Sequence, residues 1–152
     1  MRVLALAVLL LSFESIACPN LAGYFSICRS TTGSTSGARE LTVRQRLQNG
    51  VTLYQLSGID EATQERQDQS LVADGRTYVS TQVDSSGQTL VIRTWAICRQ
   101  NTLLVNQLIT GLPINLPISQ LTTTMSKSGP QLVVSITGQS RARPITDRVE
   151  CD

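Results

Sequence analysis

The chain has 152 residues, a formal net charge of +2 and no histidine. A net charge this close to zero argues against a dedicated nucleic-acid-binding protein, which usually presents a clustered basic face. Without histidine, the Ser-His-Asp and Cys-His arrangements of nucleophilic catalysis are excluded. Three arginines near the end of the chain, Arg141, Arg143 and Arg148, are explained by a solvated strand face.

The first 17 residues have the features of an export signal. Arg2 precedes an uncharged run from Val3 to Leu11, which is far shorter than the roughly 20 apolar residues of a membrane-spanning helix. Ser15 and Ala17 are small residues at the positions that signal peptidase reads. We therefore expect cleavage after Ala17 and a mature chain, residues 18–152, that folds as a single disulfide-stabilised domain in a secreted or periplasmic protein.

Cys18 would become the first residue of that mature chain. A cysteine at this position raises the alternative of an outer-membrane lipoprotein, in which Cys18 is acylated and anchors the protein. Ser15 stands where such lipoproteins carry an apolar residue. A disulfide role for Cys18 is therefore favoured, and contact with a membrane is expected only if this residue is lipidated.

The four cysteines predict two disulfides, since an even number in an exported protein is typical of a disulfide framework. No two are spaced like zinc ligands, so no metal and no cofactor is expected. Of the three connectivities we favour Cys18 with Cys28 and Cys98 with Cys151. Turn-forming residues between the first two would let the chain fold back, and the second bond would tie the C-terminus to the middle of the chain.

Alternating apolar and polar residues predict strands over most of the chain after residue 20. Residues 41–47 and 51–56 flank Asn49-Gly50, a dipeptide that favours a tight hairpin turn because both residues accept positive φ. The other predicted elements are hairpins at Asp74-Gly75, at Asp84 to Gly87 and at Ser128-Gly129-Pro130, a long strand over residues 89–98 and a closing strand over residues 145–151.

About eight to ten strands with hairpin-length connections predict an all-β meander. Neighbours in sequence should then be neighbours in the sheet, and closure into an up-and-down antiparallel barrel would remove the exposed edges. A Greek-key sandwich is the alternative fold. It needs long connections between sheets, and only residues 58–70 and 111–119 could provide them.

These two segments have different properties. Residues 58–70 are charged and compatible with a helix, which favours a solvated turn or short helix over a lid or a partner-binding loop. In residues 111–119, Pro113 and Pro117 should prevent regular strand pairing. The apolar side chains of this second segment would either cap the end of the barrel or form an apolar rim for a ligand.

The interior of such a barrel is the candidate binding site. Eight closed strands leave room for side chains or for one small ligand. Aliphatic residues together with inward hydroxyl groups favour an amphipathic or hydrophobic ligand, although a filled core explains them as well. The predicted interior residues are Phe25, Leu90, Ile92, Trp95, Leu132, Val134 and Ile136. No catalytic residue is predicted, and we do not expect an enzyme.

The chain resembles the lipocalins, which are calycin-type secreted ligand-binding barrels, at two motifs and in its terminal cysteine. Gly23-Tyr24-Phe25 is similar to the Gly-x-Trp of the family's first strand, with phenylalanine in place of tryptophan. Thr146-Asp147-Arg148 is similar to its Thr-Asp-x-Arg loop, here on the last strand. The resemblance implies a lipocalin-like barrel in which Phe25 plugs the closed end and Arg148 covers it. We therefore expect a carrier of a small hydrophobic or amphipathic molecule, or a cell-envelope module, and a monomeric protein.

A second resemblance is to the small periplasmic metalloprotease inhibitors of bacteria, which are exported, disulfide-bearing barrels. In that family the N-terminal segment enters the protease cleft. An inhibitor that acts through protein–protein contact is therefore the alternative function, although a bond between Cys18 and Cys28 would hold that segment down.

Overall fold

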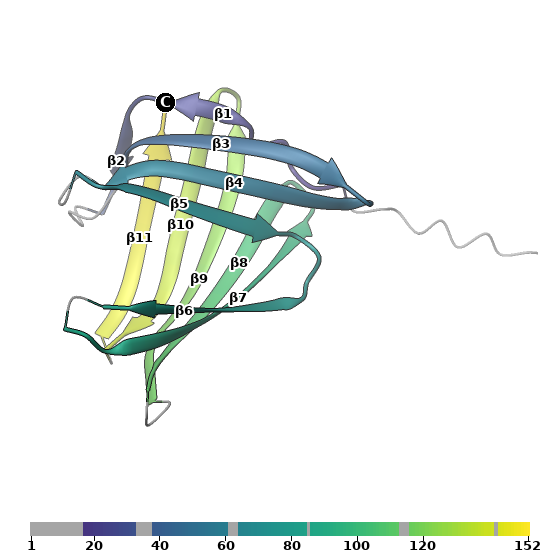
Figure 1. Ribbon diagram of the computed structural model, residues 1–152. Helices are drawn as coiled ribbons and strands as arrows, with labels where there is room; N and C mark the ends of the chain where they lie inside the picture. Colours follow the sequence, from purple (N-terminus) through teal and green to yellow (C-terminus); the bar gives the residue numbers. More distant parts are fainter. Residues whose placement is uncertain (1–16, 33–37, 61–63, 85, 113–115, 142) are drawn as a thin grey trace, which may run out of the picture.

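A computed structural model describes residues 17–32, 38–60, 64–84, 86–112, 116–141 and 143–152, and these form eleven strands (Figure 1). The described part of the chain contains no helix that could cross a membrane. Residues 1–16 of the predicted signal peptide lie outside the described residues. The strands are β1 (Gly23–Phe25), β2 (Cys28–Ser30), β3 (Ala38–Gln48), β4 (Val51–Asp60), β5 (Arg66–Val72), β6 (Thr77–Val83), β7 (Thr89–Arg99), β8 (Thr102–Gly111), β9 (Leu116–Ser128), β10 (Gln131–Ser140) and β11 (Arg143–Cys151).

The strands form two open antiparallel sheets. One has the order β1-β3-β4-β5, and the other has the order β2-β11-β10-β9-β8-β7-β6, which is a meander from β6 to β11. The prediction of an all-β meander is confirmed in this larger sheet. The prediction of one closed barrel is wrong for the described residues, because their backbone ladders do not join the two sheets.

The two sheets separate at the corner between β5 and β6 (Figure 1). The sequence predicts a hairpin at Asp74-Gly75, and Gly75 does have a positive φ of 74°. Its backbone N–H, however, donates to the carbonyl of Ala96 on β7, and the Ala73 N–H donates to the carbonyl of Thr52 on β4. The corner is thus hydrogen-bonded to both sheets. The strands on either side of it, β5 and β6, belong to different sheets and do not pair with each other.

The remaining predicted turns form paired hairpins. Asn49 and Gly50 have φ values of 52° and 77° between β3 and β4, as the dipeptide predicts. The turns before β7 and before β10 also join paired strands. The β8–β9 register shifts where Thr110 lies opposite Pro117, which agrees with the expected irregularity near this proline.

The long segments that could have crossed between sheets are largely strand. Residues 58–60 end β4 and residues 66–70 belong to β5, so the described part of 58–70 contains no helix. Residues 61–63 and 113–115 lie outside the described residues. The Greek-key sandwich required residues 58–70 to cross from one sheet to the other. Because β4 and β5 are neighbours in the same sheet, this segment does not make that crossing.

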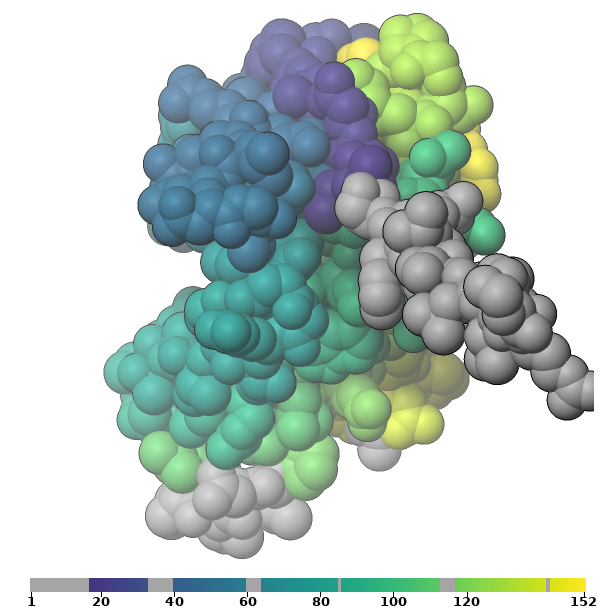
Figure 2. Space-filling view, turned by 90° about the vertical axis from the view of Figure 1, so that its right-hand side faces the viewer, coloured from purple at the N-terminus to yellow at the C-terminus, as the bar shows by residue number. Residues whose placement is uncertain are grey.

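The buried core lies where the N-terminal segment meets both sheets. It includes Leu21 and Phe25 from that segment, Tyr54 from β4, Leu103 from β8 and Leu132 from β10, each at most 2% exposed. Burying one such large apolar side chain contributes about 1.5–3 kcal/mol to folding. Figure 2 shows this segment, in purple, between the blue β3–β4 strands and the yellow-green strands of the larger sheet.

Both disulfides connect distant parts of the chain. Cys18 bonds Cys98 and Cys28 bonds Cys151, so both favoured pairings are wrong. The reason is that the N-terminal segment does not fold back on itself. It runs across the molecule, so that β1 pairs with β3 in one sheet while β2 pairs with β11 in the other, where Cys28 lies directly opposite Cys151.

Tyr54 holds the start of this segment. Its side chain is fully buried, and its hydroxyl donates a 2.7 Å hydrogen bond to the carbonyl oxygen of Pro19. Burial raises the pKa of Tyr54 to about 12 from the usual 10.0. The folded state therefore favours the neutral phenol, and the resulting stabilisation is complete below pH 10 and is lost as the pH rises toward 12.

The loss of this stabilisation at high pH leads to a prediction for the Tyr54→Phe variant. At pH 7 the variant should be less stable than the unaltered protein by about 1 kcal/mol, the net value of a hydrogen bond. Because only the unaltered protein can ionise here, the difference should shrink as the pH rises above 10. Urea unfolding of both proteins from pH 7 to 11.5 measures it, and a difference that stays constant over this range contradicts the assignment.

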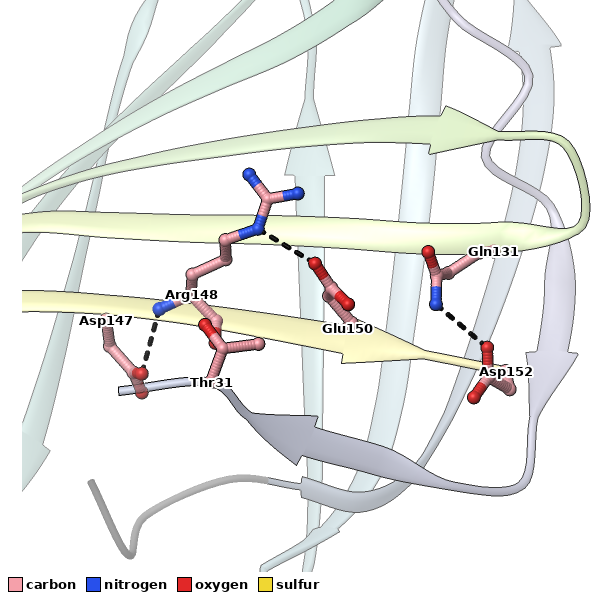
Figure 3. Close-up of polar contacts among 6 residues, drawn as sticks. All are labelled: Thr31, Gln131, Asp147, Arg148, Glu150 and Asp152. Carbon is pink, nitrogen blue, oxygen red and sulfur yellow. Dashed lines mark hydrogen bonds and ion pairs between the residues drawn. The ribbon is translucent and has the colours of Figure 1, made fainter. Parts of the chain in front are cut away.

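Lys127 is the cation that covers Phe25. Its Nζ lies 5.7 Å from the centroid of the Phe25 ring and donates a 3.0 Å hydrogen bond to the carbonyl of Ala22. The lipocalin resemblance implied Arg148 in this role, and that expectation is wrong. Arg148 instead pairs with Glu150 on its own strand, with Nε 2.9 Å from Oε1 (Figure 3).

Candidate functional site

The candidate site is a cleft between the two sheets with a volume of about 770 Å³. It lies beyond the buried core, where β5 and β6 diverge. From the smaller sheet it is lined by Leu41, Leu56, Gly58, Gln67, Asp68, Gln69 and Ser70, and from the larger sheet by Tyr78, Val79, Ser80, Gln82, Ile92, Thr94, Gln107 and Ile109. A cleft of this size lies within the usual range for small-molecule sites.

The strand period explains how these side chains reach the cleft. Ile92 and Thr94 alternate on β7 with residues that face the other way, and they lie opposite Ile109 and Gln107 on β8. The same face continues into the core at Ala96 and Cys98. One face of the larger sheet is therefore apolar core at one end and mixed polar and apolar cleft at the other.

Amide and hydroxyl groups dominate the polar part of the lining. Four glutamines contribute, Gln67, Gln69, Gln82 and Gln107, and the last of these donates a 3.3 Å hydrogen bond from Nε2 to Thr94 Oγ1. Leu41, Leu56, Val79, Ile92 and Ile109 supply the aliphatic part. Such a surface can donate and accept hydrogen bonds and can cover a short apolar group, but it offers no cation among the described lining residues.

Two ionisable groups lie at the edges of the cleft. The pKa of Asp68 is lowered chiefly by a hydrogen bond from Ser57, and also by Arg66, whose Nε is 3.3 Å from Oδ1. The Tyr78 hydroxyl donates a 2.8 Å hydrogen bond to Asp74 Oδ2, which raises the pKa of Tyr78. At neutral pH the Tyr78 hydroxyl is thus neutral and held at the corner, and Asp68 is the one carboxylate among the described lining residues.

The structure distributes the predicted interior residues between the core and the cleft. Phe25, Leu132 and Val134 are buried in the core, and Ile136 packs against it. Ile92 alone of the seven lines the cleft. Leu90 is half-buried on the same side of β7 as Ile92, whereas Trp95 lies on the opposite side.

The lining glutamines were not among the predicted site residues. Gln67 and Gln69 fall in the segment expected to be a solvated turn or short helix, yet they lie on β5 opposite Gly58 and Leu56. The available signal was their period of two, which places both on one face of a strand. Charged neighbours on the other face, Arg66 and Asp68, obscured that signal.

A separate buried carboxylate joins β11 to β2. Asp147 is 5% exposed and accepts hydrogen bonds from the hydroxyls of Ser30 and Thr32. It also accepts one from the backbone N–H of Arg148 (Figure 3). The Thr146-Asp147-Arg148 motif therefore lies on β11, where Asp147 connects this strand to β2 through hydrogen bonds within the larger sheet. Among the described residues, no three histidine, cysteine or acidic side chains are grouped so that they could hold a metal ion.

Asp147→Ala should therefore destabilise the fold by about 2 kcal/mol, because it leaves the donors of Ser30 and Thr32 without this acceptor inside the protein. Asp147→Asn, which keeps one carbonyl oxygen, should cost less. Chemical denaturation of the two variants measures the difference. Equal loss in both would mean that the hydrogen bonds to this side chain do not account for its effect.

Comparison with known proteins adds no assignment. No protein-family model matches the chain, and searches of curated proteins and of solved structures returned no significant match.

Proposed function

We propose that this is an exported binding protein that holds a small, uncharged amphipathic molecule in the cleft between its sheets. The observation that carries the proposal is the lining itself, which combines amides and hydroxyls with five aliphatic residues. A ligand with a polar, uncharged part and a short apolar part would satisfy both kinds of group. An anionic ligand would find no cation among the described lining residues to pair with, and Asp68, the one carboxylate among them, is already paired with Arg66.

The strand order supports a lipocalin-like architecture as part of this proposal. Consecutive strands pair with each other from β3 to β5 and from β6 to β11, which is the connectivity of an up-and-down barrel. The ladders break between β1 and β2, which belong to one continuous N-terminal segment, and between β5 and β6, where the cleft lies. The break between β5 and β6 then corresponds to the seam at which a barrel opens and gives a ligand access to the interior.

The compartment follows from the cysteines. Two disulfides indicate an oxidising, extracytoplasmic environment. We propose that the protein is secreted or periplasmic after cleavage behind Ala17. The lipoprotein alternative requires the Cys18 sulfur, which in this structure is bonded to Cys98.

The inhibitor alternative is less well supported. It requires a free N-terminal segment, whereas this one is held by the Cys18–Cys98 bond, by Tyr54 and by a 3.0 Å hydrogen bond from the Leu21 N–H to Gln45 Oε1. A purely structural envelope module would need no cleft. The proposal is for a binding protein and not for an enzyme.

The test compares two bulky substitutions at adjacent residues of β8. Gln107→Trp fills the cleft, whereas Leu108→Trp adds the same bulk on the opposite side of the sheet. Calorimetric titration with monomeric dodecyl maltoside, an uncharged amphipathic probe, should show saturable binding that Gln107→Trp weakens at least tenfold and Leu108→Trp leaves unchanged. Maltose alone and dodecyltrimethylammonium should bind at least tenfold more weakly than the probe.

The contradicting results are equally specific. If the unaltered protein shows no saturable binding of dodecyl maltoside, or if the two tryptophan variants behave alike while both remain folded by circular dichroism, the cleft is not the binding site. Tighter binding of the cationic probe would contradict the assignment of an uncharged ligand.

A further inference from the structure

The two sheets end in four edge strands, and β6 differs from the other three. Strands β1 and β2 have only three residues each. Strand β5 carries Arg66 and Asp68, and charges of this kind protect an edge from pairing with another chain. Strand β6, Thr77–Val83, has seven residues with no charge and no proline. It is therefore the one described edge without the usual protection.

The side chains of β6 are also unusually exposed. All seven of its residues are exposed, and these include Tyr78, Val79 at 61% and Val83 at 63%. Such residues have high strand propensity and gain stability when a neighbouring strand covers them. An uncharged edge with exposed valines is a ready template for pairing with a further strand.

The alternation of hydrogen bonds between β6 and β7 shows which backbone groups of β6 point away from β7. In the turn that joins β6 to β7, the Asp84 N–H donates to the carbonyl of Gln88. In an antiparallel ladder the bonded residues alternate, so even-numbered residues of β6 bond to β7. The N–H and C=O groups of the odd-numbered residues, Thr77, Val79, Thr81 and Val83, therefore point away from β7 and toward the open seam.

We infer that β6 pairs antiparallel with β6 of a second copy of this chain, about a twofold axis through Ser80. In this register Thr77 lies opposite Val83 of the partner subunit and Val79 lies opposite Thr81 of the partner subunit. All four outward residues of each copy then form hydrogen-bonded pairs, and Ser80 faces its own counterpart in a pair without backbone bonds. The inference goes beyond the proposed binding function and does not depend on a ligand.

Charge complementarity selects this register. It places Arg76, whose side chain is 83% exposed, opposite Asp84 of the partner subunit, and the twofold axis repeats the contact at the other end. Moving the axis to Val79 or to Thr81 puts Arg76 opposite the partner's Gln82 or the partner's Ser86, and both ion pairs are lost. The centred register is thus the one that pairs the whole strand and matches charge at both ends.

The dimer would also complete the mouth of the cleft. Tyr78 lines the cleft and, in this register, lies opposite Gln82 of the partner subunit on the same face of the extended sheet. The second copy thereby contributes an amide beside each cleft. This arrangement replaces the monomer expected from the sequence.

A proline substitution tests the pairing. Because the Thr81 N–H points outward, Thr81→Pro removes a hydrogen bond between subunits while it spares the β6–β7 ladder. Sedimentation equilibrium should show a reversible dimer for the unaltered protein and for the control Thr81→Val, with the dissociation constant raised at least tenfold by Thr81→Pro. A monomer throughout the micromolar range, or equal association of the proline and valine variants, would overturn the inference.

Cysteine cross-linking tests the register independently of affinity. The Cα atoms of a directly opposed pair without backbone bonds are about 4.5 Å apart, which a disulfide can span. The Ser80→Cys variant should therefore form a covalent dimer under mild oxidation. In the matched Gln82→Cys variant the two new sulfurs would be separated by about four residues along the strands, roughly 13 Å, and should not bond. Equal cross-linking of both variants, or of neither, would contradict the register.

Discussion

Removing the disulfide between β2 and β11 by Cys28→Ala with Cys151→Ala is expected to lower the free energy of unfolding by about 5 kcal/mol. The bond closes a loop with a sequence separation of 123 residues, and a cross-link of this length removes much conformational entropy from the unfolded chain. Thermal or urea unfolding of the double variant, compared with the unaltered protein, measures the loss.

A double-mutant cycle separates the bond from the packing of its two cysteines. If Cys28 and Cys151 are bonded, either single substitution already breaks the link, so the double variant should cost little more than a single one. The matched pair Cys28→Ala with Cys18→Ala should instead be nearly additive, because the structure places these residues in different bonds. Additivity in the first cycle and not in the second would return the chain to a Cys18–Cys28 pairing.

Gly138→Ala is expected to destabilise the fold by about 3 kcal/mol or more. Gly138 lies within β10 with a φ of +148°, a conformation that other residues rarely adopt, and a Cβ here would overlap the carbonyl oxygen of Gln120. That oxygen belongs to the backbone of β9. Gly138 is also paired with Ile145 of β11, so the ladders on both sides resist the shift that would make room.

The control for this prediction is Gly129→Ala in the turn between β9 and β10. Gly129 also has a positive φ, +62°, but a Cβ added here would have no atom within 4 Å beyond its chain neighbours. This substitution should cost only about 1–2 kcal/mol, the ordinary penalty of the left-handed region. Equal losses in the two variants by chemical denaturation would mean that the contact with Gln120 does not set the requirement for glycine at position 138.

The elements that could be predicted from the sequence are those fixed by local chemistry. Asn49-Gly50 closes a hairpin because two residues with positive φ suit the twist of the strands they join, and both strands pair directly beside the turn. Asp74-Gly75 carries the same kind of local signal. Its outcome differs because Gly75 bonds to Ala96, a contact between residues far apart in sequence.

The difference between local signals and long-range contacts also explains which features of the disulfides and of the cleft could be predicted. Four cysteines predict two bonds, but their connectivity depends on where the N-terminal segment crosses the sheets, which no local pattern reports. Ile92 could be predicted as an interior residue from strand alternation. The same alternation could place Gln67 and Gln69 on one face of a strand, but not in a binding cleft, because that face is open to polar groups only where β5 and β6 have separated.

The most direct test of the central claim is to locate a bound probe by nuclear magnetic resonance. With dodecyl maltoside at saturating concentration, intermolecular Overhauser effects from its alkyl chain should reach the methyl groups of Leu56, Ile92 and Ile109, which line the cleft. Methyl groups on the opposite face of the larger sheet, such as those of Leu108 and Val133, should show none. Contacts confined to the outer surface would contradict the account, and with it the assignment of the inter-sheet cleft as a binding site.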